Sequence, residues 1–142
     1  MSPSPTIQIA VDCADPHALA AFWAATLGMT VERHAEQVQA MIDAGSATLD
    51  DTVEIDGELA WATGAAIHDD SATLPRMIFQ QVPEAKQVKN RWHIDVSIAG
   101  DDREAEIERL VGLGASRLWE GQQGPHTWVT LADPEGNEFC VT

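Results

Sequence analysis

Two residues in the second half of the chain, His93 and Glu138, are of types that commonly transfer protons in enzymes. His93 suits an acid–base or metal-ligand role, or alternatively a hydrogen bond within a sheet. Glu138 suits a base whose pKa is raised in an apolar cleft, or alternatively the ion-pair partner of Arg91. Cys140 is either a nucleophile or a small buried hydrophobic residue. These residues are the first candidates for chemistry.

The strands expected to carry these residues alternate between apolar and polar positions. Their apolar positions are expected to face helices, and their polar positions share the other face. This face either lines a cavity or is the solvated side of an antiparallel sheet. His93, Glu138 and Cys140 favour the cavity, because they are unusual choices for solvation alone, and Trp128 is a candidate to stack on a planar ligand. The polar set is Gln8, Asp12, Gln80, His93, Asp95, His126, Trp128, Thr130, Glu138 and Cys140.

One pattern of elements occurs twice along the chain. In the first half, an alternating strand precedes a helix between Asp15 and Gly28, and in the second half another precedes a helix between Asp101 and Gly114. The pattern predicts a duplicated β-α-β-β-β unit, or alternatively two helices that end at glycine by chance. The expected strands are residues 7–12, 30–32, 59–67 and 77–82, then 93–98, 117–120, 126–133 and 137–142.

The first half also carries additional residues between its second and third strands. Residues 35–44 have apolar positions at helical spacing, and Gly45 follows them, so a helix is predicted there. Residues 49–58 are acidic, which predicts a solvated loop or, alternatively, a lid over a site.

Charge and composition restrict the partners. The chain has 142 residues, with 8 Lys and Arg against 23 Asp and Glu, a formal net charge of −15. This charge does not suit a phosphate backbone or an anionic bilayer, so we expect no nucleic acid and no membrane as partner. The two cysteines lack disulfide or zinc-motif spacing, and the chain lacks a basic leader and a long apolar run, which indicates a cytoplasmic protein.

The sequence resembles the vicinal oxygen chelate (VOC) superfamily, which includes glyoxalase I, extradiol dioxygenases, fosfomycin resistance proteins and bleomycin-binding proteins. The resemblance rests on residues 11–16 (VDCADP), on residues 89–95 (KNRWHID) and above all on the DPEGN turn at 133–137. It covers nearly the whole chain and is strongest for the glyoxalase-like subgroup. It implies an α+β fold in which two βαβββ modules, residues 6–83 and 91–142, form a curled mixed sheet around a central cleft in a single domain, residues 1–142.

The resemblance also implies a ligand set for a metal ion, because metal-dependent members use four inward side chains from the first and last strands of each module. Gln8, Gln80 and His93 match three of these positions. Cys140 stands where the usual ligand is Glu, and Glu138 is one inward position earlier. Carboxamide oxygens are weak ligands, so the set suits Mn, Fe or Ni poorly unless Glu138 binds. The cofactor stays open between a divalent ion held by His93, Gln8 and Glu138 and no metal.

Two functions are consistent with these residues. In the first, the chain is a lyase, isomerase or oxygenase-like enzyme for a small organic molecule, and His93 and Glu138 transfer protons. In the second, it sequesters an aromatic or cationic natural product without chemistry, as bleomycin-binding relatives do. The resemblance further implies a homodimer. The residues expected to contact the ligand are Gln8, Gln80, Arg91, Trp128 and Cys140.

Overall fold

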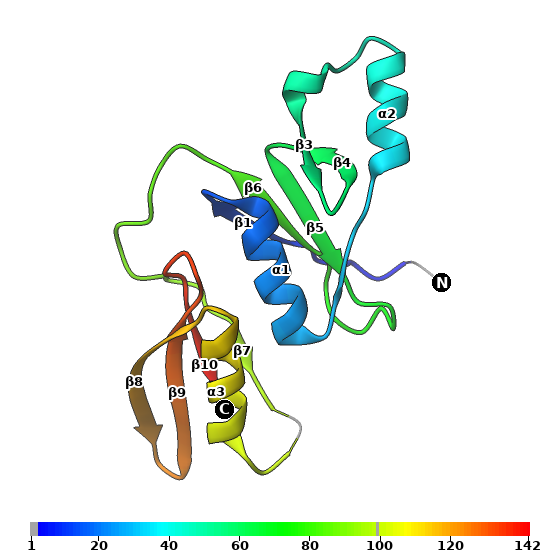
Figure 1. Ribbon diagram of the computed structural model, residues 1–142. Helices are drawn as coiled ribbons and strands as arrows, with labels where there is room; N and C mark the ends of the chain where they lie inside the picture. Colours follow the sequence, from blue (N-terminus) through cyan, green and yellow to red (C-terminus); the bar gives the residue numbers. More distant parts are fainter. Residues whose placement is uncertain (1–2, 99) are drawn as a thin grey trace. The chain divides into compact units, whose positions relative to one another are not determined.

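The structure, a computed structural model, describes residues 3–98 and 100–142, and it divides into a first unit up to Pro83 and a second unit from Glu84 (Figure 1). The first unit contains β1 (Ile9–Cys13), α1 (Pro16–Leu27), β2 (Thr30–Val31), α2 (Ala35–Asp43), the 3-10 helix η1 (Leu49–Asp51), β3 (Thr52–Ile55), β4 (Glu58–Trp61), β5 (Gly64–His68) and β6 (Met77–Gln81). The second unit contains β7 (Asp95–Val96), α3 (Arg103–Leu113), β8 (Ser116–Gln123), β9 (His126–Ala132) and β10 (Glu138–Val141).

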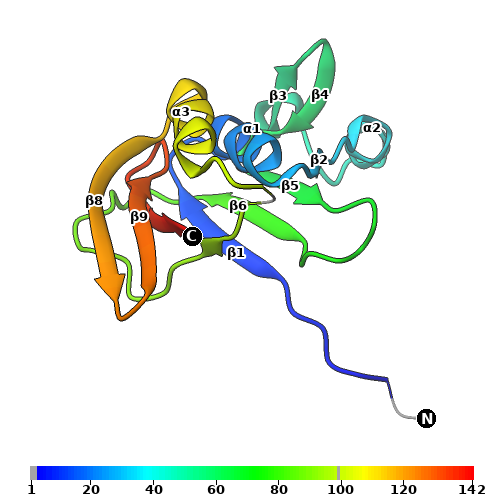
Figure 2. The ribbon, with the colours of Figure 1, turned by 90° about the horizontal axis from the view of Figure 1, so that it is seen from below.

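The two units repeat one topology. The first sheet has the order β1-β6-β5-β2 and the second has the order β7-β10-β9-β8. In each sheet the first strand pairs parallel with the last strand of its unit, and the remaining pairs are antiparallel. Figure 2 shows the strands of the first sheet, with β6 beside β1. The predicted α+β fold of two βαβββ modules is therefore confirmed.

The helix ends follow from the capping residues in the sequence. Asp15 accepts a hydrogen bond from the Ala18 amide at 3.1 Å, and Asp102 accepts one from the Ala105 amide at 3.0 Å. Gly28 ends α1 with a φ of 68°, a conformation that glycine adopts without a steric penalty. Among the described helices, none is long and apolar enough to cross a bilayer.

The second unit has its core on one face of its sheet. Ile107 and Leu110 of α3 are buried. Apolar residues of β9 and β10 that alternate with the polar set are buried as well. These buried strand residues are Val129, Leu131, Phe139 and Val141. Because side chains alternate along a strand, the polar residues between them lie on the other face of the sheet.

The prediction of an acidic loop at residues 49–58 is wrong. Residues 52–55 form β3, which pairs with β4 so that Ile55 is opposite Glu58. The two residues between them, Asp56 and Gly57, have φ values of 52° and 80°, as a tight hairpin turn requires. The predicted strand at residues 59–67 is correspondingly divided into β4 and β5. Ile7, expected within the first strand, precedes β1 and is exposed.

An irregularity in β8 changes which of its side chains reach the polar face. Arg117 pairs with Leu131, but Trp119 pairs with Thr130, so Leu118 is an extra residue in the strand. Opposed residues share a face, and this bulge therefore places Trp119 beside Thr130 rather than in the core.

The turn between β9 and β10 is held by the Asp133 carboxylate. Asp133 is buried and accepts hydrogen bonds from the amides of Glu135 and Asn137 at 2.9 and 3.0 Å. It also accepts one from the Asn137 side chain at 2.9 Å. The carboxylate thus fixes the register of the two strands that carry most of the polar set.

We expect Asp133→Ala to lower the free energy of unfolding by about 2–3 kcal/mol, because it leaves three partly buried N–H donors without their acceptor. Urea denaturation followed by circular dichroism measures this change. Asp101→Ala, at an exposed position, is the control and should change it by less than about 0.5 kcal/mol. Equal losses in the two variants would contradict this role of the turn.

Candidate functional site

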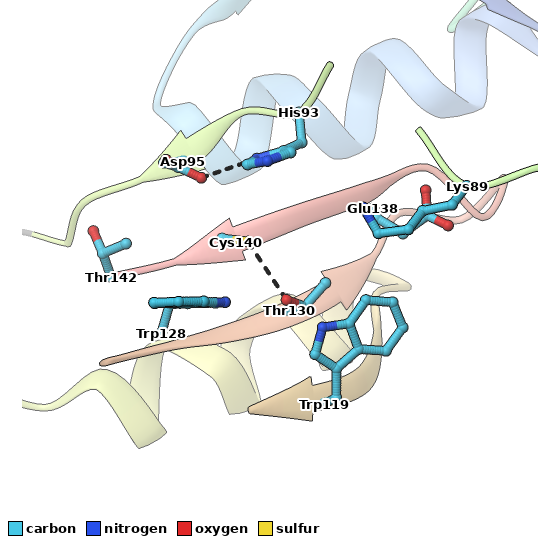
Figure 3. A pocket seen from close by; sticks show the side chains of 9 residues that line it. All are labelled: Lys89, His93, Asp95, Trp119, Trp128, Thr130, Glu138, Cys140 and Thr142. Atoms are coloured by element: carbon cyan, nitrogen blue, oxygen red, sulfur yellow. Dashed lines mark hydrogen bonds and ion pairs between the residues drawn. The ribbon is translucent and has the colours of Figure 1, made fainter. Parts of the chain in front are cut away.

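A pocket of about 380 Å³ lies on the polar face of the second unit's sheet (Figure 3). All four strands of the sheet, or the residues just before them, contribute to it. Its lining residues are Lys89, His93, Asp95, Trp119, Trp128, Thr130, Glu138, Cys140 and Thr142. Four of the residues predicted to form a site, His93, Trp128, Glu138 and Cys140, are therefore brought together in one place.

Strand register explains why these side chains meet. Cys140 is opposite Asp95 in the parallel pair β7–β10 and opposite Thr130 in the antiparallel pair β9–β10. Thr130 is in turn opposite Trp119. These four residues form one row across the sheet, and opposed side chains lie on the same face.

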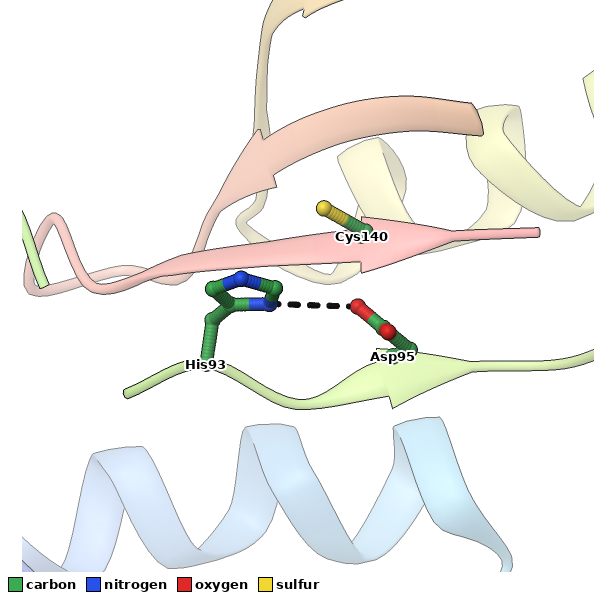
Figure 4. A group of neighbouring side chains, drawn as sticks. All are labelled: His93, Asp95 and Cys140. Carbon is green, nitrogen blue, oxygen red and sulfur yellow. Dashed lines mark hydrogen bonds and ion pairs between the residues drawn. The ribbon is translucent and has the colours of Figure 1, made fainter. Parts of the chain in front are cut away.

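His93, Asp95 and Cys140 converge at one side of the pocket (Figure 4). Their potential ligand atoms, an imidazole nitrogen, a carboxylate oxygen and the thiol sulfur, all lie within 4.8 Å of one another. His93 Nδ1 is 3.1 Å from Asp95 Oδ1. Because a carboxylate only accepts hydrogen bonds, Nδ1 is the donor in this contact, and an ion held by both side chains would replace that hydrogen.

The donor set of these three residues fits a divalent ion of the zinc class. Two ligand atoms at about 2.0–2.3 Å from one tetrahedral ion are about 3.3–3.8 Å apart. Side-chain rotations that move the ligand atoms by about 1 Å would therefore bring them to the distances that the ion requires. His93 and Asp95 are exposed and have that freedom, whereas Cys140 is buried. A thiolate together with an imidazole favours zinc or cobalt over magnesium, calcium or manganese.

Sequence reasoning did not identify Asp95 as a candidate ligand. The available signal was the His-x-Asp spacing, which puts His93 and Asp95 on one face of a strand. Cys140 joins them only through the pairing of β7 with β10, which is not visible in the sequence.

Glu138 has a different environment from either one expected. Its carboxylate accepts hydrogen bonds from Lys86 Nζ at 3.1 Å and from the Asn90 amide at 2.9 Å. Burial raises the pKa of Glu138, but the hydrogen bonds from Asn90 and Lys86 outweigh it, and the net pKa is below the ordinary value. The expectation of a raised pKa is wrong, and the cationic partner is Lys86 rather than Arg91.

The other predicted site residues lie elsewhere. Gln8 Oε1 accepts a hydrogen bond from Arg76 at 2.8 Å in the first unit. Gln80 is exposed and lines a pocket of about 430 Å³ in that unit, where Trp61 is also found. Arg91 is exposed and is not among the described residues that line either pocket. The ligand-binding roles of Gln8, Gln80 and Arg91 stay predictions.

The family of the chain follows from comparison with known sequences. A sequence model of the glyoxalase-like domain matches residues 8–142. The protein therefore belongs to the glyoxalase-like domain family. No curated protein sequence matches the chain.

Solved structures share the fold at low sequence identity. Fosfomycin resistance protein FosX from Listeria monocytogenes, complexed with Mn(II) and dihydroxypropylphosphonic acid, has a TM-score of 0.63 at 12% identity, over 99% of this chain and 90% of that chain. A hypothetical protein from S. aureus has a TM-score of 0.60 at 10% identity, over 99% and 94%. A glyoxalase/bleomycin resistance protein/dioxygenase family enzyme from Burkholderia phytofirmans has a TM-score of 0.56 at 14% identity, over 94% of each chain.

The lowered pKa of Glu138 predicts a specific titration. Its interaction with Lys86 and Asn90 is complete at neutral pH and is lost as the pH falls through the folded-state pKa. We expect the amide proton shift of Asn90, followed by NMR between neutral pH and about pH 3, to titrate with a midpoint below the ordinary Glu value of 4.5. Glu138→Gln should abolish this titration. A midpoint above the ordinary value would contradict the account.

Proposed function

We propose that the second unit is a metal-assisted site for a small organic molecule, in which His93, Asp95 and Cys140 hold a divalent ion of the zinc class. The observation that carries the proposal is the convergence of three chemically different ligand atoms within 4.8 Å at one side of a pocket. An ion bound there would polarise a substrate oxygen or lower the pKa of a bound water. The pocket is about 380 Å³, within the range of small-molecule sites.

The chain's own residues divide the remaining tasks. Without an ion, Asp95 accepts the hydrogen of His93 Nδ1; an ion bound by both side chains would take the place of that hydrogen, with Nδ1 and Oδ1 as its ligand atoms. Glu138 is ionised and holds Lys86 and the Asn90 amide, which supports the segment that leads to His93. Its lowered pKa makes it a weak base, so we assign it this supporting role and not proton transfer.

A second candidate function is sequestration of a planar molecule without chemistry. The observation that favours it is the presence of two indoles, Trp119 and Trp128, in one pocket. Recovery of unaltered ligand after incubation with zinc-loaded protein supports sequestration, whereas a chemically changed ligand supports the enzyme.

The metal site is tested by loading the purified protein with zinc or cobalt and measuring bound metal by inductively coupled plasma mass spectrometry after gel filtration. We expect about one ion per chain in the wild type, with a thiolate-to-cobalt charge-transfer band in the cobalt form. Removing any one of three ligands, by His93→Ala, Asp95→Asn or Cys140→Ser, should weaken binding at least tenfold, because each supplies one of the few strong donors.

Matched variants of residues outside the pocket serve as controls. His126→Ala removes an exposed histidine of the same sheet, and Cys13→Ser changes the other buried cysteine. Both should retain the wild-type metal content. Metal binding that survives Cys140→Ser with an unchanged cobalt spectrum would overturn the proposed ligand set.

A further inference from the structure

Trp128 lies against the backbone of β8 in a way that only glycine allows. Gly121 is opposite Trp128 in the β8–β9 pair. A Cβ atom at Gly121 would overlap Cε2, Nε1 and Cζ2 of the indole, closer than the 3.0 Å that Cβ atoms keep from other heavy atoms. The indole therefore covers the place where a side chain of residue 121 would be, and its position as a wall of the pocket depends on Gly121.

The second indole is placed by the bulge in β8. Trp119 is opposite Thr130, in the row next to that of Gly121 and Trp128. Figure 3 shows both rings beside Thr130 on the pocket face. Two indoles on neighbouring rows offer flat apolar surface suited to an aromatic ligand.

The local charge of the pocket is opposite to what the net charge of −15 suggests. Glu138 is paired with Lys86. In the proposed metal site, the negative charges of the Asp95 carboxylate and the Cys140 thiolate balance the two positive charges of the ion. Lys89 lines the pocket and donates to the Asn90 carbonyl at 3.4 Å, and no carboxylate within residues 3–98 and 100–142 pairs with it. With the ion bound, the charge left for a ligand is that of the Lys89 ammonium.

We propose that the pocket takes a planar aromatic ligand that carries one anionic group, with the ring against Trp128 on Gly121 and the anion paired with Lys89. This inference rests on the proposed metal site and adds a substrate class, an aryl carboxylate or a similar monoanion. It disfavours the cationic natural product of the sequestration function, because a cation would meet the Lys89 ammonium without a free carboxylate partner.

The experiment uses three probes of equal ring size and different charge: naphthoate, naphthamide and naphthylmethylammonium. Isothermal titration calorimetry measures their binding to the zinc-loaded full chain, and zinc content is measured in the same samples. We expect naphthoate to bind about threefold to fivefold more tightly than naphthamide, and the ammonium probe to bind more weakly than either. Lys89→Gln should make naphthoate and naphthamide equal while zinc content stays unchanged.

The role of Gly121 is tested by a matched pair of glycine variants. Gly121→Ala should displace the indole and weaken naphthoate and naphthamide about fivefold to tenfold. Gly112→Ala is the control, because a Cβ at Gly112 in α3 meets no atom within 4 Å. In a Trp128→Leu background, Gly121→Ala should cause no further loss, which distinguishes displacement of the indole from misfolding.

The outcomes separate the two proposals. Protein that binds zinc but has equal affinity for the three probes overturns the substrate class and leaves the metal site standing. Protein that binds no zinc overturns both, because the negative charge of Asp95 then remains beside the ligand. Loss of probe binding in Gly121→Ala that is equally large in the Trp128→Leu background overturns the role of the glycine.

Discussion

The parallel pairing of β7 with β10 is the constraint on which the site depends. β7 is two residues long, and its partner β10 places Cys140 opposite Asp95. The pairing is extended by backbone hydrogen bonds from Cys140 to Ile94 and from Thr142 to Val96, both 3.0 Å long. A slip of one residue would turn Cys140 to the face that now holds Phe139 and would dissolve the three-residue cluster. The turn held by Asp133, at the other end of β10, also fixes the register of this strand.

Local electrostatics in the pocket depart from the overall acidity of the chain. Most of the negative charge lies on the solvated surface, where salt screens it and where it affects the rate at which charged partners approach. Within the pocket, each carboxylate has a specific partner: Glu138 has Lys86 and Asn90, and Asp95 has His93. These pairs and Lys89 determine which ligand charge the pocket favours, so the net charge of the chain does not predict the charge of the ligand.

Much of the framework was predictable because its signals are local. Asp15 and Gly28 mark the ends of α1, and the alternation at residues 138–141 put Glu138 and Cys140 on one face. The β3–β4 hairpin was missed although Asp56-Gly57 between alternating residues is a hairpin signal, because the acidic composition of the segment outweighed it.

The parts of the site that were not predicted depend on long-range pairing or on loop conformation. Asp95 becomes a candidate ligand only when β10 lies beside β7. Trp119 reaches the pocket only because of the bulge at Leu118, whose position alternation does not reveal. The choice of Lys86 over Arg91 as the partner of Glu138 depends on the path of the segment before β7.

In the proposed function, His93, Asp95 and Cys140 together form one ion site. The most direct measurement is a crystal structure of the full chain grown with zinc, with diffraction data collected on both sides of the zinc absorption edge. We expect one strong anomalous peak at about 2.0–2.3 Å from ligand atoms of His93, Asp95 and Cys140. A peak held by other residues, with none at Cys140, would contradict this ion site.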